Sequence, residues 1–180
     1  MAHQRKLIRA AVETRLKAAG TVASQRVFGN RARQVYPAEM PCIVVYTKSD
    51  PAEISAEAPR EYKRQLSLVL ELVMQASKEE TLDDSLDDFC EQVENAIFTD
   101  ETFGGLVSDT VLSDCEMDIL VEGEKPIGGL KITLTMTYYQ QLPAAPAATL
   151  SDFGKAVVKT NLAPMDGTID SEDQITVPTS

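Results

Sequence analysis

The sequence predicts an α+β fold in which a four-stranded, mainly antiparallel sheet carries two helices on one face. Apolar and polar residues alternate from Tyr62 to Met74, and the same alternation returns from Leu130 to Tyr139. Between these two runs, Leu82 to Ile97 carries an apolar stripe at helical spacing. Side chains alternate between the two faces of a strand and recur every 3.6 residues along a helix. The pattern therefore predicts two long core strands with a helix between them in the sequence.

The chain begins with a predicted amphipathic helix over Ala2 to Ala19, and Gly20 is suited to its C′ position. Arg15 falls within the apolar arc near the end of this helix. We expect its long side chain to reach out to solvent and to do no more than that. The apolar arc consists of Leu7, Ile8, Ala11, Val12, Leu16, Ala18 and Ala19.

The next segment, Val22 to Tyr36, has short apolar bursts around Gly29-Asn30, which predicts a small hairpin or an irregular loop. Met40 to Tyr46 reads as a strand opened by proline, a residue that strands tolerate at their first position.

Lys48 to Arg60 contains two prolines, several small or acidic residues and no periodicity, which predicts a long mobile loop. Unstructured loops of this length in compact domains are usually functional or disordered. We therefore consider it a candidate assembly loop, with Lys48, Asp50, Glu53, Glu57 and Arg60 as its candidate contact residues.

After the central strand and a break at 76–80, Thr81-Leu-Asp-Asp resembles a capping box that starts the second helix. The apolar stripe of this helix comprises Leu82, Leu86, Phe89, Val93, Ala96 and Ile97. Acidic residues occupy the opposite side: Asp83, Asp84, Asp87, Asp88, Glu91 and Glu94.

The chain then turns through Gly104-Gly105 within 99–107. Thr110 to Val121 and Leu130 to Tyr139 are the last two predicted strands, joined by the turn-rich segment 122–129. We expect Leu86, Phe89 and Val93 to be buried against Leu68, Leu70 and the region of Leu134.

Residues 1–142 therefore form the predicted α+β domain, and residues 143–180 form a Pro/Ala linker with an extended C-terminal arm. The linker composition begins at Gln140. In the arm, Leu150 to Val158 is long enough for one or two helical turns. The arm has too few large apolar residues to fold alone.

The residue inventory argues against catalysis. His3 is the only histidine, and the glycine-rich phosphate-binding and nucleophile-elbow motifs are missing. The acidic residues of 83–94 lack the spacing of a calcium-binding loop. We therefore expect no enzyme activity, no cofactor and no metal site. The three cysteines, Cys42, Cys90 and Cys115, are unpatterned and are expected to be buried free thiols.

No stretch of 18 apolar residues is available to span a membrane, and the basic start lacks the apolar run of a secretory signal.

The net charge of −11 conceals a partition of charge along the chain. Residues 1–36 carry eight Lys or Arg and one acid, whereas residues 79–124 carry sixteen acids and no Lys or Arg. These regions are either two solvated faces or two surfaces that meet between copies of the protein. Specific nucleic-acid binding has little support at a sequence pI near 4.5. The candidate subunit-interface residues are Arg5, Lys6, Arg9, Arg31, Arg33, Asp84, Asp87, Asp88 and Glu91.

The order of these segments resembles the tail terminator proteins of long-tailed bacteriophages, of the minor tail protein U type. The resemblance covers about residues 5–140 and rests on pattern and order, with no single specific motif. It is carried by the basic first helix, Met40-Pro-Cys-Ile-Val-Val-Tyr, the mobile loop, the alternating strand, Leu82-Asp-Asp-Ser-Leu-Asp-Asp and a final hairpin ending in Thr-Tyr-Tyr. The arm at 150–178 is similar to extensions in longer members.

The resemblance implies a structural protein of the virion tail, made in the host cytoplasm. Members of this family form a six-membered ring that caps the tail tube, stops its polymerisation and meets the head-side connector. The implied partners are other copies of the chain, the tail tube protein and the connector, with DNA passing through the ring without specific binding. A tail tube or neck protein and a cytosolic adaptor module are the alternatives.

Overall fold

The structure is a computed structural model that describes residues 3–29, 35–76, 79–120, 126–141, 155–160 and 171–176. Its contacts divide the chain into two units, Met1–Leu142 and Pro143–Ser180.

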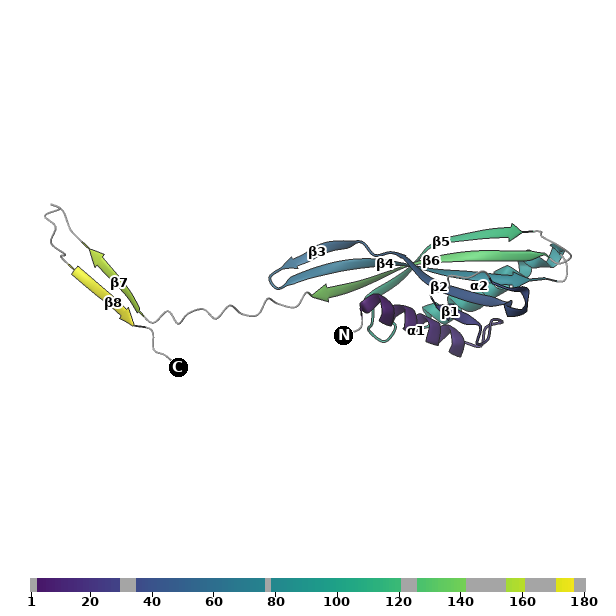
Figure 1. Ribbon diagram of the computed structural model, residues 1–180, viewed down its shortest axis with the longest axis horizontal. Helices are drawn as coiled ribbons and strands as arrows, with labels where there is room; N and C mark the ends of the chain where they lie inside the picture. Colours follow the sequence, from purple (N-terminus) through teal and green to yellow (C-terminus); the bar gives the residue numbers. More distant parts are fainter. Residues whose placement is uncertain are drawn as a thin grey trace. The chain divides into compact units, whose positions relative to one another are not determined.

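The first unit is α+β, with two helices and a mixed sheet of six strands (Figure 1). The strand order is β1-β2-β4-β6-β5, and β3 pairs with the far end of β4. Strands β1 and β2 are parallel, whereas the other neighbours are antiparallel. The elements are α1 (Gln4–Ala18), β1 (Val27–Gly29), η1 (Pro37–Glu39), β2 (Cys42–Ser49), β3 (Ala52–Glu57), β4 (Arg60–Gln75), η2 (Glu79–Thr81), α2 (Leu82–Phe98), β5 (Asp109–Leu120) and β6 (Ile127–Gln141).

Strands β4 and β6 form the centre of the sheet and pair without interruption from Glu61↔Gln141 to Gln75↔Ile127. Their alternating apolar side chains point to one face and join a single buried cluster with both helices. Within that cluster Phe89, Leu68 and Leu134 are at most 1% exposed, so the predicted packing of the second helix is confirmed. Helix α1 packs over β1 and β2, α2 packs over β4 and β6, and the two helices touch each other.

Gly128 on β6 allows α2 to approach the sheet closely. A Cβ atom at this position would lie 2.6 Å from Leu86 Cδ1, which is closer than packed side chains tolerate. Any side chain here would force Leu86 and Leu82 to shift, so glycine favours the close crossing of the first turns of α2 over β6.

The prediction of four strands misses β1 and β3, because neither of these short strands has a clear pattern of large apolar residues. The segment 22–36 was expected to be a hairpin or loop, but Val27–Gly29 pairs in parallel with Ile43–Val45 of β2. The segment 48–60 was expected to be a loop, but β3 and β4 form a hairpin there. Strand β3 is largely exposed, so its sequence, Ala-Glu-Ile-Ser-Ala-Glu, shows no buried alternation.

Two helix predictions are also corrected. Thr81 is the N-cap of α2, but its side chain makes no capping hydrogen bond, because the residues before it already form a 3₁₀ turn. In the second unit helical turns were expected within 150–158, but residues 155–158 belong to β7 (Lys155–Thr160), which pairs antiparallel with β8 (Ser171–Thr176), and 150–154 lie outside the described residues.

Candidate interaction surfaces

The first half of α1 and β2 border an open depression of about 300 Å³ with a basic lining. The lining residues are His3, Arg5, Lys6, Arg9 and Thr47. His3 is the N-cap of α1, and its Nδ1 atom accepts a hydrogen bond of 3.2 Å from the backbone N–H of Arg5. Four cationic or ionisable side chains and the positive end of the helix dipole thus surround one depression, which favours an anionic partner.

One of these basic side chains, that of Arg5, also stabilises the fold through an ion pair. Arg5 Nε lies 3.5 Å from a carboxylate oxygen of Asp50, whose side chain is only 3% exposed. Arg64 binds the same oxygen at 2.6 Å, and the hydroxyl of Tyr138 donates to it at 3.0 Å. Burial and this hydrogen bond to Asp50 raise the pKa of Tyr138 to about 12. The Asp50 side chain is therefore a buried polar anchor in the connection between β2 and β3.

The remaining residues proposed for an assembly loop lie on this hairpin. Lys48 is exposed at the end of β2, and Glu53 is exposed on β3. Glu57 and Arg60 flank the turn and form an exposed ion pair of 3.3 Å. The hairpin is regular structure; whether it meets another subunit stays a prediction.

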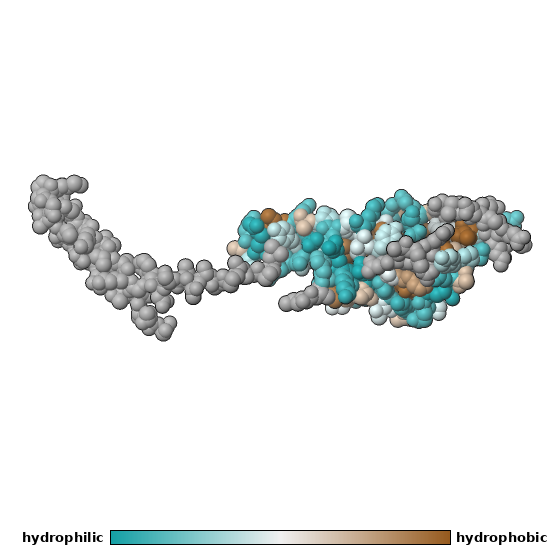
Figure 2. All heavy atoms as spheres, viewed as in Figure 1, coloured by the Kyte–Doolittle hydropathy of each residue, from teal (hydrophilic) through white to brown (hydrophobic). Residues whose placement is uncertain are grey.

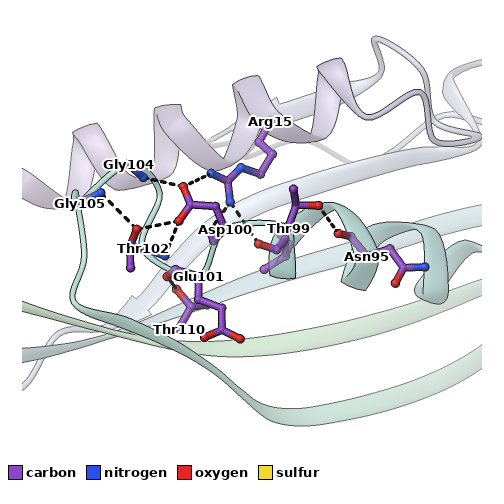
Figure 3. Close-up of polar contacts among 10 residues, drawn as sticks. Arg15, Asn95, Thr99, Asp100, Glu101, Thr102, Gly104, Gly105 and Thr110 are labelled. Atoms are coloured by element: carbon purple, nitrogen blue, oxygen red, sulfur yellow. Dashed lines mark hydrogen bonds and ion pairs between the residues drawn. The ribbon is translucent and has the colours of Figure 1, made fainter.

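Arg15 has a larger role than the sequence suggested. Its guanidinium donates to the carbonyl oxygens of Ile97 and Asp100, and it lies 3.1 Å from the Asp100 carboxylate (Figure 3). It also stacks 3.7 Å from the centre of the Phe103 ring. Arg15 therefore caps the C-terminal end of α2 and links α1 to the loop at 99–108. The helical pattern of the sequence shows only that Arg15 lies in the apolar arc. Its partners are about 80 residues away, so the pattern does not reveal them.

Asp100 organises that loop. The hydroxyl and backbone N–H of Thr102 and the backbone N–H of Gly104 donate to its carboxylate at 2.6–3.0 Å (Figure 3). These hydrogen bonds, from the Thr102 hydroxyl first, lower the pKa of Asp100 to about 2. The loop after α2 is thus built around one ionised carboxylate.

The acidic surface begins on α2, where the predicted residues Asp84, Asp87, Asp88 and Glu91 are exposed. It continues onto β5. Burial raises the pKa of the Cys115 thiol, and the negative charges of Glu94, Asp114 and Asp87 raise it further, although a hydrogen bond with Cys90 opposes this shift. Carboxylates of the helix and of the strand therefore lie close enough to act on the same group.

The two thiols at this junction differ in exposure. Cys115 is exposed and Cys90 is buried, with their sulfur atoms 4.0 Å apart. The prediction that all three cysteines are buried is therefore wrong for Cys115, because α2 covers β4 and β6 but leaves β5 open. Burial raises the pKa of Cys90 as well, with a further contribution from the proximity of Cys115.

Strand β5 is the acidic end of the sheet. It pairs with β6 on one side, and no described strand pairs with its other side. Leu112 and Met117 are 39% and 41% exposed, although their cross-strand partners on β6, Leu134 and Leu130, are buried. Such an edge offers main-chain donors, acceptors and apolar side chains to another strand.

Together these features give the first unit an electrostatic polarity. Basic α1 lies over β1 and β2, at one end of the strand order, whereas acidic α2 and β5 lie toward the other. Arg31 and Arg33, also proposed for the basic surface, lie outside the described residues. In the view of Figure 2 the described surface is mostly hydrophilic, with apolar side chains in small separate groups.

Among the described residues, no group of three or more His, Cys, Asp or Glu is arranged to hold a metal ion. Within the same part of the chain, no helix combines the length and apolar character needed to cross a membrane.

Comparison with known proteins finds no matching family model and no matching curated protein. Among solved structures, the chain is similar to one from the virion of a native gene transfer agent particle. The TM-score is 0.34 at 9% sequence identity, over 72% of this chain and 94% of the other. Similarity at this level does not establish a shared function, so the proposals below rest on this chain's own residues.

Proposed function

We propose that this protein is a structural component of a virion tail that assembles into a closed ring. The observation that carries the proposal is the polarity of the first unit. The basic surface around Lys6 and Arg9 and the acidic surface of α2 and β5 lie toward opposite ends of the strand order. Unlike surfaces on opposite sides of one subunit suit head-to-tail contacts, and such contacts close into rings when the rotation permits.

Within this proposal the ring is a hexamer that caps the tail tube, ends its polymerisation and joins it to the head-side connector. The order of sequence segments that resembles tail terminator proteins supports this more specific role. DNA would pass through the ring without specific binding. Another neck or tube protein, or a non-catalytic adaptor, is the alternative, and an adaptor would not form rings.

We also propose that the protein is not an enzyme. His3, the only histidine, is the N-cap of α1 and contacts Arg5. The acidic cluster is spread over an exposed helix face, where it is available to a partner surface.

Negative-stain microscopy and sedimentation of the purified full-length protein over a range of concentrations test the ring directly. We expect closed rings at high concentration. A protein that stays monomeric at about 1 mM would have an association free energy weaker than about −4 kcal/mol, and the proposal would fail.

The charges are tested with Lys6→Glu alone and together with Arg9→Glu. Exposed pairs are worth about 0–1 kcal/mol each, so each change should weaken association up to about fivefold at low salt. Arg5 is left intact because it also holds Asp50. Lys17→Glu, on the same helix but outside the basic depression, is the control with the same change of charge. Asp87→Lys with Asp88→Lys should partly restore association. Equal effects of Lys6→Glu and Lys17→Glu would mean that only net charge matters.

A further inference from the structure

Two sheets in this chain end in edges without a described partner. In the first unit β1, β3 and β5 each have such an edge, and that of β5, twelve residues long, is the longest. In the second unit, β7 and β8 pair only with each other and form a sheet of two strands. A two-stranded sheet alone is marginally stable in water, and a long bare edge tends to recruit another strand.

Of β7, β8 and a second copy of β5, only β7 carries charges opposite to those of β5. The β5 sequence contains Asp109, Asp114, Glu116 and Asp118 and no Lys or Arg. The β7 sequence, Lys-Ala-Val-Val-Lys-Thr, contains two lysines and no acid, whereas β8 contains Glu172 and Asp173 and no base. Opposite charges on neighbouring strands stabilise pairing and like charges oppose it. Pairing of β5 with β7 is therefore favoured over pairing with β8 or with a second β5.

We infer that strand β7 of one copy pairs with the open edge of β5 on a neighbouring copy, extending the neighbour's sheet by the β7–β8 hairpin. A second copy is the partner that the proposed ring supplies, and docking on the same chain is the alternative outcome that the crosslinking below distinguishes. This rests on the proposed ring and gives the C-terminal unit its role in that ring.

The chain is long enough to reach a neighbour. Twelve residues, 143–154, separate Leu142 from Lys155, and an extended chain of that length spans at most about 40 Å. The apolar side chains exposed on β5, Val111, Leu112 and Met117, would gain cross-strand contacts with the valines of the β7 sequence. The main-chain hydrogen bonds would supply affinity, as in other cases of strand addition.

Zero-length carbodiimide crosslinking of full-length protein tests the contact itself. Equal amounts of ¹⁴N- and ¹⁵N-labelled protein are mixed before crosslinking, and linked peptides are identified by mass spectrometry. We expect links from Lys155 or Lys159 to Asp114 or Glu116 that join ¹⁴N and ¹⁵N peptides. Links between peptides of the same label only would show that the hairpin docks on its own chain, and the inference would be overturned.

The energetic test uses charge reversal. Lys155→Glu with Lys159→Glu should raise the concentration for half-association about tenfold or more at low salt, and Asp109→Lys with Asp114→Lys should restore it. Glu172→Lys with Asp173→Lys on β8 is the control: it disturbs the β7–β8 pair, where Glu172 lies opposite Lys159, but it leaves the charges of the proposed β5–β7 contact intact and should have a smaller effect. Rings that form normally with both lysines reversed would refute the strand exchange and leave the ring proposal standing. A wild-type protein that forms no rings would refute both.

Discussion

Strands β4 and β6 run through two regions that are stabilised in different ways. In the region beneath α2, Leu66, Leu68, Leu70 and Leu72 are fully buried and the packing is apolar. Beyond it, the other ends of β4 and β6 and the short β3 project past α1 as a three-stranded ribbon (Figure 1). There most side chains are exposed or half-buried, and the buried polar groups, Tyr138 and the Asp50 carboxylate, contact each other and Arg64.

The comparison shows that one continuous strand pair need not have one source of stability. Beneath the helices, side-chain burial stabilises the sheet. In the ribbon, the backbone ladder is supported by a buried carboxylate with Arg64, Arg5 and Tyr138 around it. Because Arg5 belongs to α1, this polar cluster is also what ties the ribbon to the helix layer.

The largest expected effect comes from breaking the helix-covered region. Phe89→Ala should lower the free energy of unfolding by about 3–5 kcal/mol, because the ring is fully buried between α2 and the sheet and its removal leaves a cavity. The exposed neighbour provides a control: Asp88→Ala should change the free energy by less than about 0.5 kcal/mol. Urea denaturation of both variants measures this. A loss below about 1 kcal/mol for Phe89→Ala would contradict the packing described here.

A smaller effect is expected from breaking the ribbon. Asp50→Ala leaves Arg64 and the Tyr138 hydroxyl without their shared acceptor, which should cost about 1–3 kcal/mol. Hydrogen exchange should locate the loss, with faster exchange in β3 and in 60–65 than in 66–74. Glu57→Ala removes the exposed ion pair on the same hairpin and should cost no more than about 1 kcal/mol. Uniform acceleration along all of β4 would mean that the two regions are not energetically separate.

The same contrast explains what sequence reasoning could predict. The core strands and both helices were predictable because burial on one face produces periodicity, as in Leu66 to Leu72 and Leu82 to Ile97. Strand β3 was not, because residues on both of its faces, such as Glu53 and Ile54, are exposed, so burial imposes no strong pattern there. Strand β1 has only three residues, which is too short for a period to show.

Among the candidate contact residues, the split between basic α1 and acidic α2 follows from charge counting alone. The specific roles of Arg5, Arg15 and Asp50 do not. Arg5 and Arg15 bind residues 45 or more positions away in the sequence, and Asp50 binds residues on other elements. These contacts exist only after folding. The exposed edge of β5 was also missed, because its alternation is that of an ordinary core strand and its position at the end of the sheet is a property of the topology.

The smallest effect concerns a partly exposed polar contact of the helix layer, where Asp100, on the loop after α2, binds Arg15 of α1. Its pKa is lowered to about 2 in the folded protein, so the unfolded chain binds a proton first as the pH falls. The stability that this carboxylate contributes is present above its ordinary value of 3.8 and is lost as the pH falls from about 4 to about 2. Asp100→Asn should therefore lower stability at neutral pH and show a weaker pH dependence within that window. Asn keeps one acceptor oxygen for Thr102, but its NH2 group stands where the second oxygen accepted from Gly104 and Arg15, so those two hydrogen bonds are lost as well. Thermal melts of both proteins between pH 7 and pH 2.5 measure the difference, and Asp109→Asn, an exposed acid outside this loop, is the control.

Parallel curves for wild type and Asp100→Asn would show that the hydrogen bonds position the loop without favouring the ionised carboxylate. Apolar burial would then be the only source of stability beneath the helices, and polar anchoring would be confined to the ribbon.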